Sequence, residues 1–246
     1  MKKFITFFAY ALLLGSMTFT LTACGGDDDD AGGSSAGGLT PAGKAAQMVD
    51  LGLPSGTLWA DRNVGADKPE AYGSYFAWGE TVPKSDYSWS TYKYGNGDSK
   101  NNLFTKYCQD AKYGKDGYTD SYIEHLHVDD AASVNWGGNW RMPSEEQIEE
   151  LYNNTDNTWV DDFEGTGVSG RKFTNKKDSS KFIFLPATGY RYGTSLEIAG
   201  SYGYYWSRTL SDNLFRAYDL SFHSGYVNCS NNSRSIGHTV RPVVAP

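Results

Sequence analysis

Positive charge is scarce in this chain of 246 residues. Lysine and arginine together number 22, against 29 aspartate and glutamate residues, and the net charge is −7. Proteins that bind nucleic acid neutralise phosphates with basic side chains. Anionic lipid headgroups would likewise repel an acidic surface. The composition therefore argues against nucleic acid as a partner.

Motifs of common enzymes are missing from the part of the chain expected to fold. We find no phosphate loop there and no Gly-x-Ser-x-Gly nucleophile elbow. Residues 165–170 match Gly-x-Gly-x-x-Gly, but no apolar strand precedes them and no convincing helix follows. A pyrophosphate site needs both flanks. We interpret this segment as a glycine-rich loop and expect no cofactor.

Metal signatures are missing as well. The sequence has no EF-hand loop and none of the triplets that hold calcium in C-type lectins. His125 and His127 would share one face of a strand, but a zinc site needs more ligands. His223 and His238 are distant in sequence. We interpret all four as surface or packing residues and expect no metal.

Paired carboxylates could serve a glycosidase, where two acids flank one bond. The adjacent pairs are Asp129-Asp130 and Asp161-Asp162. Asp129 is better explained as the cap of a short helix over residues 130–134, and the second pair as part of a solvated loop. The sequence thus predicts no catalytic residues.

Aromatic residues and glycine are abundant, with 18 Tyr, 12 Phe, 7 Trp and 28 Gly. Long amphipathic helices are scarce, so we expect short strands, many ordered loops and a few helices. The clearest helix begins at Ser144, where Ser144 and Gln147 form a capping box. Ile148, Leu151 and Tyr152 then make an inward stripe at helical spacing.

Strands and loops follow from alternation and turn residues. The predicted strands are residues 57–63, 181–185, 204–207, 216–222 and 238–244. The predicted loops are residues 156–170 and 224–236. There is no internal repeat and no second linker, so residues 48–246 should form one domain.

The N-terminus has the features of a lipoprotein signal peptide over residues 1–23. Lys2 and Lys3 precede an apolar run, residues 4–14, which is too short to span a bilayer. The run is followed by Leu21-Thr22-Ala23-Cys24, which resembles a bacterial lipobox. Cys24 should carry the lipid, and two or more acyl chains give stable membrane anchoring.

Residues 24–47 predict a flexible tether, since Gly, Ser, Ala and Asp dominate the segment. Loss of Lys2 and Lys3 with the signal leaves 20 basic and 29 acidic side chains, a net charge of −9. The four aspartates at residues 27–30 resemble the acidic signal that sends Bacteroidetes-type lipoproteins to the outer face of the outer membrane. We expect a lipid-anchored, cell-surface protein. Cys108 and Cys229 would lie in an oxidising compartment, where a disulfide is allowed.

Several phrases in a fixed order carry a family resemblance. They are residues 49–60, 73–80, 129–132, 136–144, 185–191, 203–207 and 237–243, and they include Trp136-Gly137-Gly138-Asn139-Trp140-Arg141-Met142-Pro143-Ser144. Together they resemble the Fibrobacter succinogenes major paralogous domain over residues 49–244. That family in turn resembles the C-type lectin-like fold, including the branch with the formylglycine-generating enzymes. The resemblance implies a single α+β domain of short helices, small antiparallel sheets and long loops.

The aromatic and arginine residues of these phrases divide into two groups. One group is predicted to be structural: Trp136, Trp140, Arg141, Trp206 and Arg241. Their rings should pack beside glycines, and the two arginines should be buried and hold loop carbonyls or a carboxylate such as Asp130.

A second group clusters around glycine-rich turns and comprises Tyr190, Tyr192, Tyr202, Tyr204 and Tyr205. Tyrosine offers a large, rigid contact area at low entropy cost. These residues are the candidate ligand-binding surface.

The leading hypothesis is a non-catalytic recognition or structural module on the cell surface, with a glycan or protein ligand. The first alternative is a surface enzyme acting on polysaccharide or peptide, which would need a carboxylate or histidine pair in a cleft. The second is an architectural envelope protein without a soluble ligand. It predicts that the loop tyrosines are packed rather than exposed.

Overall fold

The computed structural model describes residues 38–98, 101 and 103–246, all within one compact unit. The predicted signal peptide, Cys24 and the acidic run lie outside these residues. Over the described part of the chain, no helix has the length and apolar character needed to cross a bilayer.

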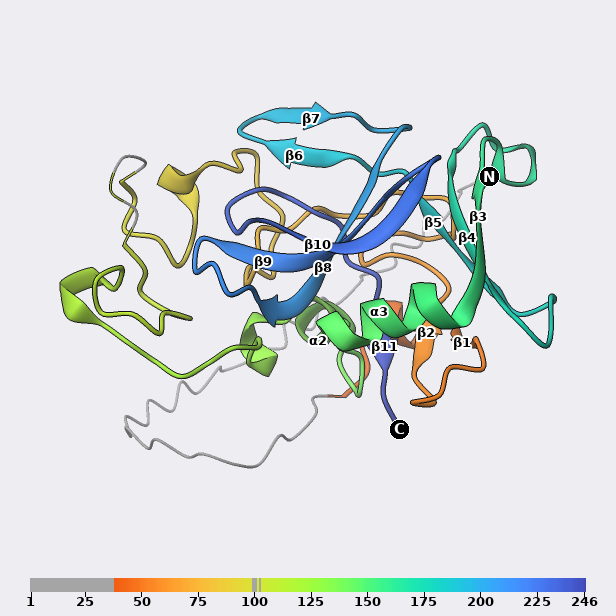
Figure 1. The fold of residues 1–246 in the computed structure, drawn as a ribbon, viewed down its shortest axis with the longest axis horizontal. Helices are drawn as coiled ribbons and strands as arrows, with labels where there is room; N and C mark the ends of the chain where they lie inside the picture. Colours follow the sequence, from red (N-terminus) through yellow and green to blue (C-terminus); the bar gives the residue numbers. More distant parts are fainter. Residues whose placement is uncertain (1–37, 99–100, 102) are drawn as a thin grey trace, which may run out of the picture. The chain divides into compact units, whose positions relative to one another are not determined.

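The fold is α+β, as expected, with short helices and small antiparallel sheets (Figure 1). The helices are α1 (Pro41–Ala45), α2 (Ala131–Trp136) and α3 (Glu145–Asn154), with 3-10 turns η1 (Trp89–Thr91), η2 (Lys115–Gly117), η3 (His127–Asp129) and η4 (Phe163–Gly165).

Four sheets are found in the described residues. One has the order β1-β2-β11, with β1 (Met48–Asp50), β2 (Leu58–Ala60) and β11 (Val243–Val244). A second has the order β3-β4-β5, with β3 (Thr155–Val160), β4 (Gly170–Asn175) and β5 (Phe182–Pro186). The third has the order β10-β9-β8, with β8 (Gly203–Leu210), β9 (Arg216–His223) and β10 (Tyr226–Ser233). The last is the hairpin of β6 (Tyr190–Tyr192) and β7 (Ser195–Glu197).

The capped helix is confirmed. In α3 the Ser144 hydroxyl accepts from the Gln147 N–H, and the Gln147 side chain accepts from the Ser144 N–H. Ile148 and Leu151 are buried and Tyr152 is half-buried. The inward face of α3 packs on the β8–β9–β10 sheet, as Figure 1 shows.

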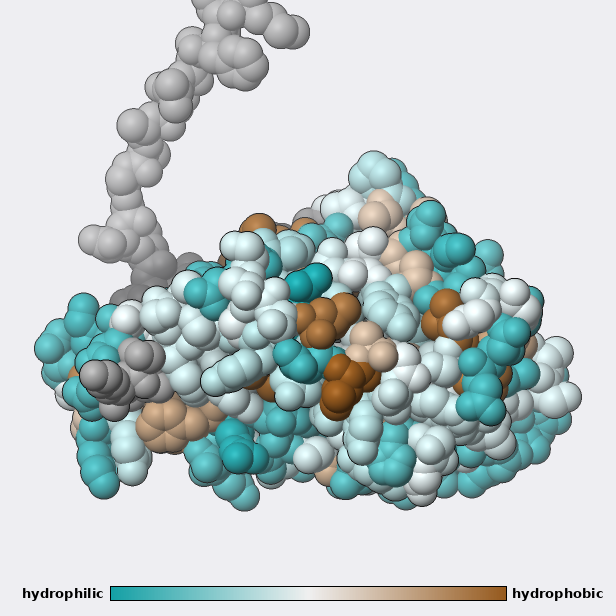
Figure 2. All heavy atoms as spheres, turned by 90° about the horizontal axis from the view of Figure 1, so that it is seen from above, coloured by the Kyte–Doolittle hydropathy of each residue, from teal (hydrophilic) through white to brown (hydrophobic). Residues whose placement is uncertain are grey.

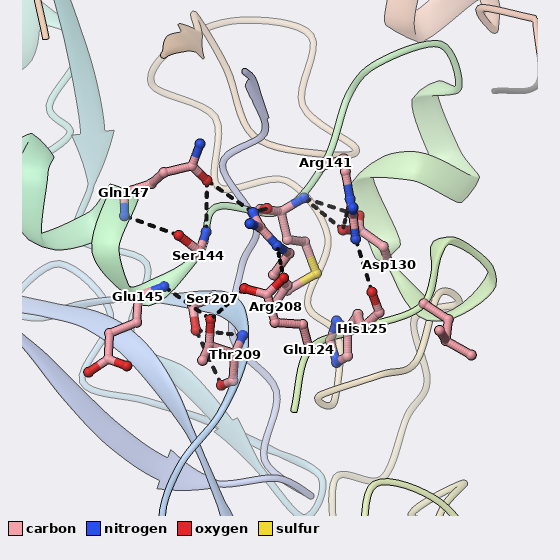
Figure 3. A network of polar contacts seen from close by, with 12 residues as sticks. Glu124, His125, Asp130, Arg141, Ser144, Glu145, Gln147, Ser207, Arg208 and Thr209 are labelled. Carbon is pink, nitrogen blue, oxygen red and sulfur yellow. Dashed lines mark hydrogen bonds and ion pairs between the residues drawn. The ribbon is translucent and has the colours of Figure 1, made fainter. Parts of the chain in front are cut away.

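The cap predicted for the earlier helix is wrong by one residue. Asp130, not Asp129, caps α2 by accepting from the Ser133 N–H at 2.9 Å. The Asp130 carboxylate also accepts from the Met142 N–H and lies 3.7 Å from the Arg141 guanidinium (Figure 3). Asp129 has other partners, described below.

The folded domain begins earlier than residue 48. Thr40 caps α1, donates its hydroxyl to the Asn135 carbonyl and donates its backbone N–H to the Trp136 carbonyl of α2 at 2.9 Å. The Trp140 indole donates to the Gly43 carbonyl. The tether prediction was therefore too long at its C-terminal end, because a small-residue segment can pack closely against tryptophan even without apolar bulk.

Two predicted loops contain strands. Residues 156–170 include most of β3, and residues 224–236 include all of β10. Both are edge strands rich in Thr, Asn and Ser, which hid the apolar alternation on which the prediction depended. In contrast, the strand predicted at 238–244 is reduced to Val243–Val244. Pro242 interrupts the ladder because it has no N–H to donate.

Two hydrophobic clusters form the core. One joins α3 to the sheets through Ile148, Leu151, Phe173, Leu220 and Phe222. The other underlies the long loops and includes four buried tryptophans, Trp78, Trp136, Trp140 and Trp206. The last three are buried in the core, as expected. Trp136 and Trp140 pack edge to face, and the Trp206 indole donates to the Phe76 carbonyl at 2.8 Å.

Arg241 is fully buried, as predicted, and bonds to backbone rather than to a carboxylate. Its guanidinium donates to the Ala60 carbonyl, the Phe184 carbonyl and the Asn63 side chain, at 2.8–3.1 Å. Burial lowers the pKa of Arg241 to about 10. The residue therefore stays protonated at neutral pH and ties β2 to β5.

Arg141 is half-buried rather than buried. Its guanidinium donates to the His125 carbonyl at 2.9 Å and lies beside Asp130 (Figure 3). The predicted contacts with a carbonyl and with Asp130 are thus present, at the edge of the core.

Sequence reasoning missed Arg234, which is also fully buried. Its guanidinium donates to the carbonyls of Lys106, Tyr107 and Leu214 and to the Tyr92 hydroxyl. It lies over the rings of Trp78, Tyr92 and Phe104, at 4.4–5.4 Å from their centroids. Arg234 thereby fixes the long loops against the core.

Replacement of Arg234 by lysine should destabilise the domain by about 3 kcal/mol or more, because a compact ammonium cannot serve four acceptors and leaves buried carbonyls unpaired. Urea unfolding followed by tryptophan fluorescence measures the change. The exposed Arg216→Lys is the matched control and should change stability by less than about 0.5 kcal/mol. Equal effects of the two substitutions would contradict the role assigned to Arg234.

Candidate functional site: an aromatic ladder on the β8–β9–β10 sheet

The β8–β9–β10 sheet has one face in the core, and its other face is buried at Trp206, Asp219 and Ser221 but reaches solvent around Tyr204, His223 and Tyr226. Alternation places Tyr205, Leu220 and Phe222 on the core side. The other face carries Tyr204 and Trp206 from β8, Asp219, Ser221 and His223 from β9, and Tyr226, Asn228, Ser230 and Asn232 from β10. The accessible side chains of this face, those of Tyr204, His223 and Tyr226 and the polar side chains of β10, belong to the candidate site.

Aromatic rings form a continuous series across this face, which we call the aromatic ladder: Tyr190, Tyr204, Tyr202, His223 and Tyr226. Tyr190 meets Tyr204 edge to face at 5.5 Å, and Tyr202 stacks parallel to Tyr204 at 6.2 Å. His223 follows at 4.9 Å from Tyr202, and Tyr226 at 4.2 Å from His223. The rings are partly accessible, and Tyr226 is 39% exposed.

Three of the five predicted tyrosines therefore come together, namely Tyr190, Tyr202 and Tyr204. Tyr192 lies on the β6–β7 hairpin and is 64% exposed, outside the ladder. Tyr205 must be removed from the candidate set. It points into the core, is 1% exposed and donates to the Pro186 carbonyl. The reason is the strand period of two, which sends Tyr204 and Tyr205 to opposite faces.

A row of polar side chains lies beside the ladder. Asn228 is exposed, and Ser230 and Asn232 are half-buried along β10. Ser221 is directly opposite both Tyr204 and Asn228, and its hydroxyl lies 3.3 Å from the Tyr226 hydroxyl. The site thus combines flat rings with neutral amide and hydroxyl groups. Burial raises the pKa of Tyr204 to about 12, so its phenol keeps its proton at neutral pH.

Beneath the ladder lies a buried pair, Asp219 and His238. The His238 ring stacks on Trp206 at 4.0 Å and on Tyr204 at 5.1 Å, and its Nδ1 is 3.4 Å from Asp219 Oδ2. Burial raises the pKa of Asp219 to about 7 and lowers that of His238. Burial thus favours the uncharged form of each side chain, because a charge here lacks solvation. His238 therefore serves as a flat support for Tyr204.

The surface around the β6–β7 hairpin has no broad apolar area. Figure 2, seen from above the view of Figure 1, shows pale and hydrophilic residues with small, separated hydrophobic patches. Exposed apolar side chains of the hairpin region include Leu196 and Ile198. A ligand for this region must present polar groups as well as apolar surface.

A second polar cluster surrounds Asp129, the residue wrongly predicted as a cap. Its carboxylate accepts from the hydroxyls of Tyr94 and Tyr107 and pairs with the Lys106 and Lys93 ammonium groups. Burial opposes ionisation, but the hydrogen bonds from Lys106 and the tyrosines outweigh it, and the pKa of Asp129 is lowered. This cluster joins the loop at 93–107 to η3 and is structural.

Next to that cluster, His125 is a packing histidine, as predicted. It is buried, lies 4.0 Å from the Trp78 ring, and neither ring nitrogen has a hydrogen-bond partner. Among the residues described, no three His, Cys, Asp or Glu side chains are arranged to hold a metal ion. Cys108 and Cys229 are both free thiols.

Comparisons with known proteins match only the C-terminal third of the chain. Residues 166–243 match a family described as a domain of unknown function (DUF8237). The matched segment contains β4 to β10 and thus the whole aromatic ladder. Searches among curated proteins and solved structures gave no match.

Sequence reasoning missed His223, Tyr226 and the polar row of β10. A signal was present: the dipeptide Ser224-Gly225 is a turn former between two segments of alternating residues. Pairing of Tyr226 with His223 closes this two-residue hairpin. Because residues 224–236 were predicted to be a loop, the side chains of β10 were not recognised as part of the site.

Replacement of His125 by phenylalanine should remove part of the acid sensitivity of the fold. Burial holds the pKa of His125 well below its usual value, so below about pH 6.5 the unfolded chain binds a proton that the native chain does not. The stability that depends on neutral His125 is therefore fully present above about pH 6.5 and is lost as pH decreases. The free energy of unfolding should fall by about 1.4 kcal/mol between about pH 7.5 and 5.5 from this residue.

Urea unfolding of wild type and His125→Phe across this range measures the difference in slope. The variant keeps the ring stack on Trp78 and should lose less stability on acidification. An unchanged slope would show that His125 takes up a proton in the native state.

Proposed function

We propose that this protein is a non-catalytic recognition module that binds neutral carbohydrate through the aromatic ladder. The observation that carries the proposal is the contiguous series from Tyr190 to Tyr226 beside a row of uncharged Asn and Ser side chains. Sugar rings have C–H faces that stack on aromatic rings and a rim of hydroxyls that bond to amides and hydroxyls. Both surfaces have counterparts here.

Other ligand classes fit this face less well. Aromatic rings also stack nucleic-acid bases, but the chain has an excess of acidic residues and the ladder is accompanied by neutral side chains. Flat rings mounted on a sheet lose little entropy on binding, which favours weak polar ligands such as glycans.

A catalytic role finds little support in the described residues. Asp219 and His238 are the one acid–histidine pair beneath the ladder, and both side chains are fully buried. A group that cannot reach substrate cannot transfer a proton to it. The architectural alternative, which requires packed tyrosines, is opposed by the exposure of Tyr192 and Tyr226.

We also propose that the scaffold is C-type lectin-like and related to the Fibrobacter succinogenes major paralogous domain. Two features support this. The closing strand β11 pairs with β2 near the start of the domain, and Arg141-Met142-Pro143-Ser144 leads into α3. In this proposal, lipid on Cys24 and the acidic residues 27–30 hold the domain on the outer face of the outer membrane.

The double variant Tyr202→Ala/Tyr204→Ala should weaken binding to neutral polysaccharide by at least about tenfold, because stacked aromatics are the energetic centre of such contacts. Affinity electrophoresis of the detergent-solubilised protein in gels containing starch, xylan, mannan or β-glucan measures this.

Tyr118→Ala is the matched control, since Tyr118 is an exposed tyrosine far from the ladder in sequence and bonds only to Asp120. It should migrate as wild type does. If no gel retards the wild type, or if both variants are retarded as strongly as wild type, glycan binding by the ladder is wrong.

Cys24→Ser should abolish incorporation of radiolabelled palmitate and release the protein from membranes, because the lipid supplies the anchor. Protease treatment of intact cells then tests the location of the wild-type domain. Release of the domain while a periplasmic marker survives supports the surface location. Protection until the outer membrane is opened would contradict it and would favour a periplasmic role.

A further inference from the structure

A concave surface lies at the other end of strand β8, away from the aromatic ladder. A groove of about 950 Å³ is formed by the β8–β9 connection, the first turn of α3 and the loop at 109–123. Tyr204 of the ladder and Leu210 of the groove are six residues apart on β8, a separation of roughly 20 Å in a strand. The groove is therefore a separate site from the ladder.

The floor and one wall of the groove are apolar. Phe215 packs edge to face with Tyr113 at 5.3 Å, and both line the groove together with Leu210 and Leu214. Ile123 stands at the edge with 62% of its surface exposed. Large apolar side chains left open to solvent in a concavity are typical of an interaction surface.

Every charged residue that lines the groove is acidic. Asp110, Glu145, Glu146 and Asp212 contribute four carboxylates, and no lysine, arginine or histidine is among the lining residues. Burial is the main cause that raises the pKa of Glu145, and repulsion by the carboxylates of Glu146, Glu149 and Asp212 raises it further. Glu146 is kept ionised by its bond with Ser144, which lowers its pKa.

The cations near these acids are engaged elsewhere. The Arg208 guanidinium pairs with Glu124 at 2.8 Å and donates to the Met142 carbonyl and to Gln147 (Figure 3). In the same network the Glu145 N–H donates to the Thr209 hydroxyl, which anchors the first turn of α3 beside β8. Lys112 lies over the Tyr113 ring at 5.1 Å but does not line the groove.

We propose that this groove binds a basic peptide segment of a partner protein, with lysine or arginine side chains beside the four carboxylates and an apolar side chain on Phe215 and Leu214. Charge complementarity selects the occupant, since an acidic groove with an apolar floor attracts cationic segments and rejects acidic ones. The acidic tether of the same chain would be repelled. The inference goes beyond carbohydrate binding and does not depend on it.

The direct test is fluorescence anisotropy with the detergent-solubilised full chain and a fluorescein-labelled octapeptide of alternating lysine and leucine. The triple variant Glu145→Gln/Glu146→Gln/Asp212→Asn should bind this peptide at least about tenfold more weakly than wild type at about 50 mM salt. The difference should shrink at about 300 mM salt, where screening is stronger. Ile123→Ser should weaken binding at both salt concentrations.

A matched control separates the groove from overall charge. Asp67→Asn/Asp116→Asn/Asp156→Asn changes net charge by the same amount at exposed aspartates outside the groove, and it should bind as wild type does. Circular dichroism checks that each variant is folded. The proposal is overturned if wild type does not bind the peptide, if both triple variants lose affinity equally, or if a glutamate–leucine octapeptide binds as well.

Discussion

The structure depends on the pairing of buried backbone groups in a domain with little regular secondary structure. From the end of β2 at Ala60 to the start of α2 at Ala131, the residues that the structure describes form only 3-10 turns and isolated bridges. Buried carbonyls in such loops need donors, since each one left unpaired costs roughly 1–3 kcal/mol. Arg234 donates to the Lys106 and Tyr107 carbonyls of these loops, and together Arg234 and Arg241 pair five backbone carbonyls. Aromatic rings around Arg234 stabilise its charge where no carboxylate does.

Fixed loops in turn allow the β8–β9–β10 sheet to hold an organised surface. The core face of the sheet packs against α3 and β4, while His238, itself stacked on Trp206, supports Tyr204 from beneath. Tyr190, Tyr204, His223 and Tyr226 of the ladder lie on strands, and Tyr202 directly precedes β8. Their geometry is therefore set before any ligand arrives, which lowers the entropy lost on binding.

Two surfaces of different chemistry occupy opposite ends of one strand. The ladder is flat, aromatic and neutral, whereas the groove is concave, apolar at its floor and acidic at its rim. A tethered protein with both could bind carbohydrate and a protein partner independently, because no residue of the ladder lines the groove. The arrangement is consistent with a scaffold on which function depends on individual surfaces rather than on the fold.

Local features could be predicted from the sequence. Short-range patterns and the phrases of the family resemblance predicted the α+β class, the capping box at Ser144, the buried tryptophans, the buried Arg241, and the grouping of Tyr190, Tyr202 and Tyr204. Their physical basis is local, since a cap, a helical stripe or a glycine-rich turn is specified within a few residues. The sequence also determined the excess of negative charge.

Tertiary structure decided which faces those residues occupy. It buried Tyr205 and added His223 and Tyr226 to the ladder, because strand register, and not spacing in the sequence, sets the face of a side chain. Asp130 rather than Asp129 caps α2, because the Asp129 carboxylate is bound by two tyrosines and two lysines that lie more than twenty residues away along the chain. The role of Arg234 could not be predicted from the sequence, because its four acceptors lie 20–142 residues away along the chain and only folding brings them together.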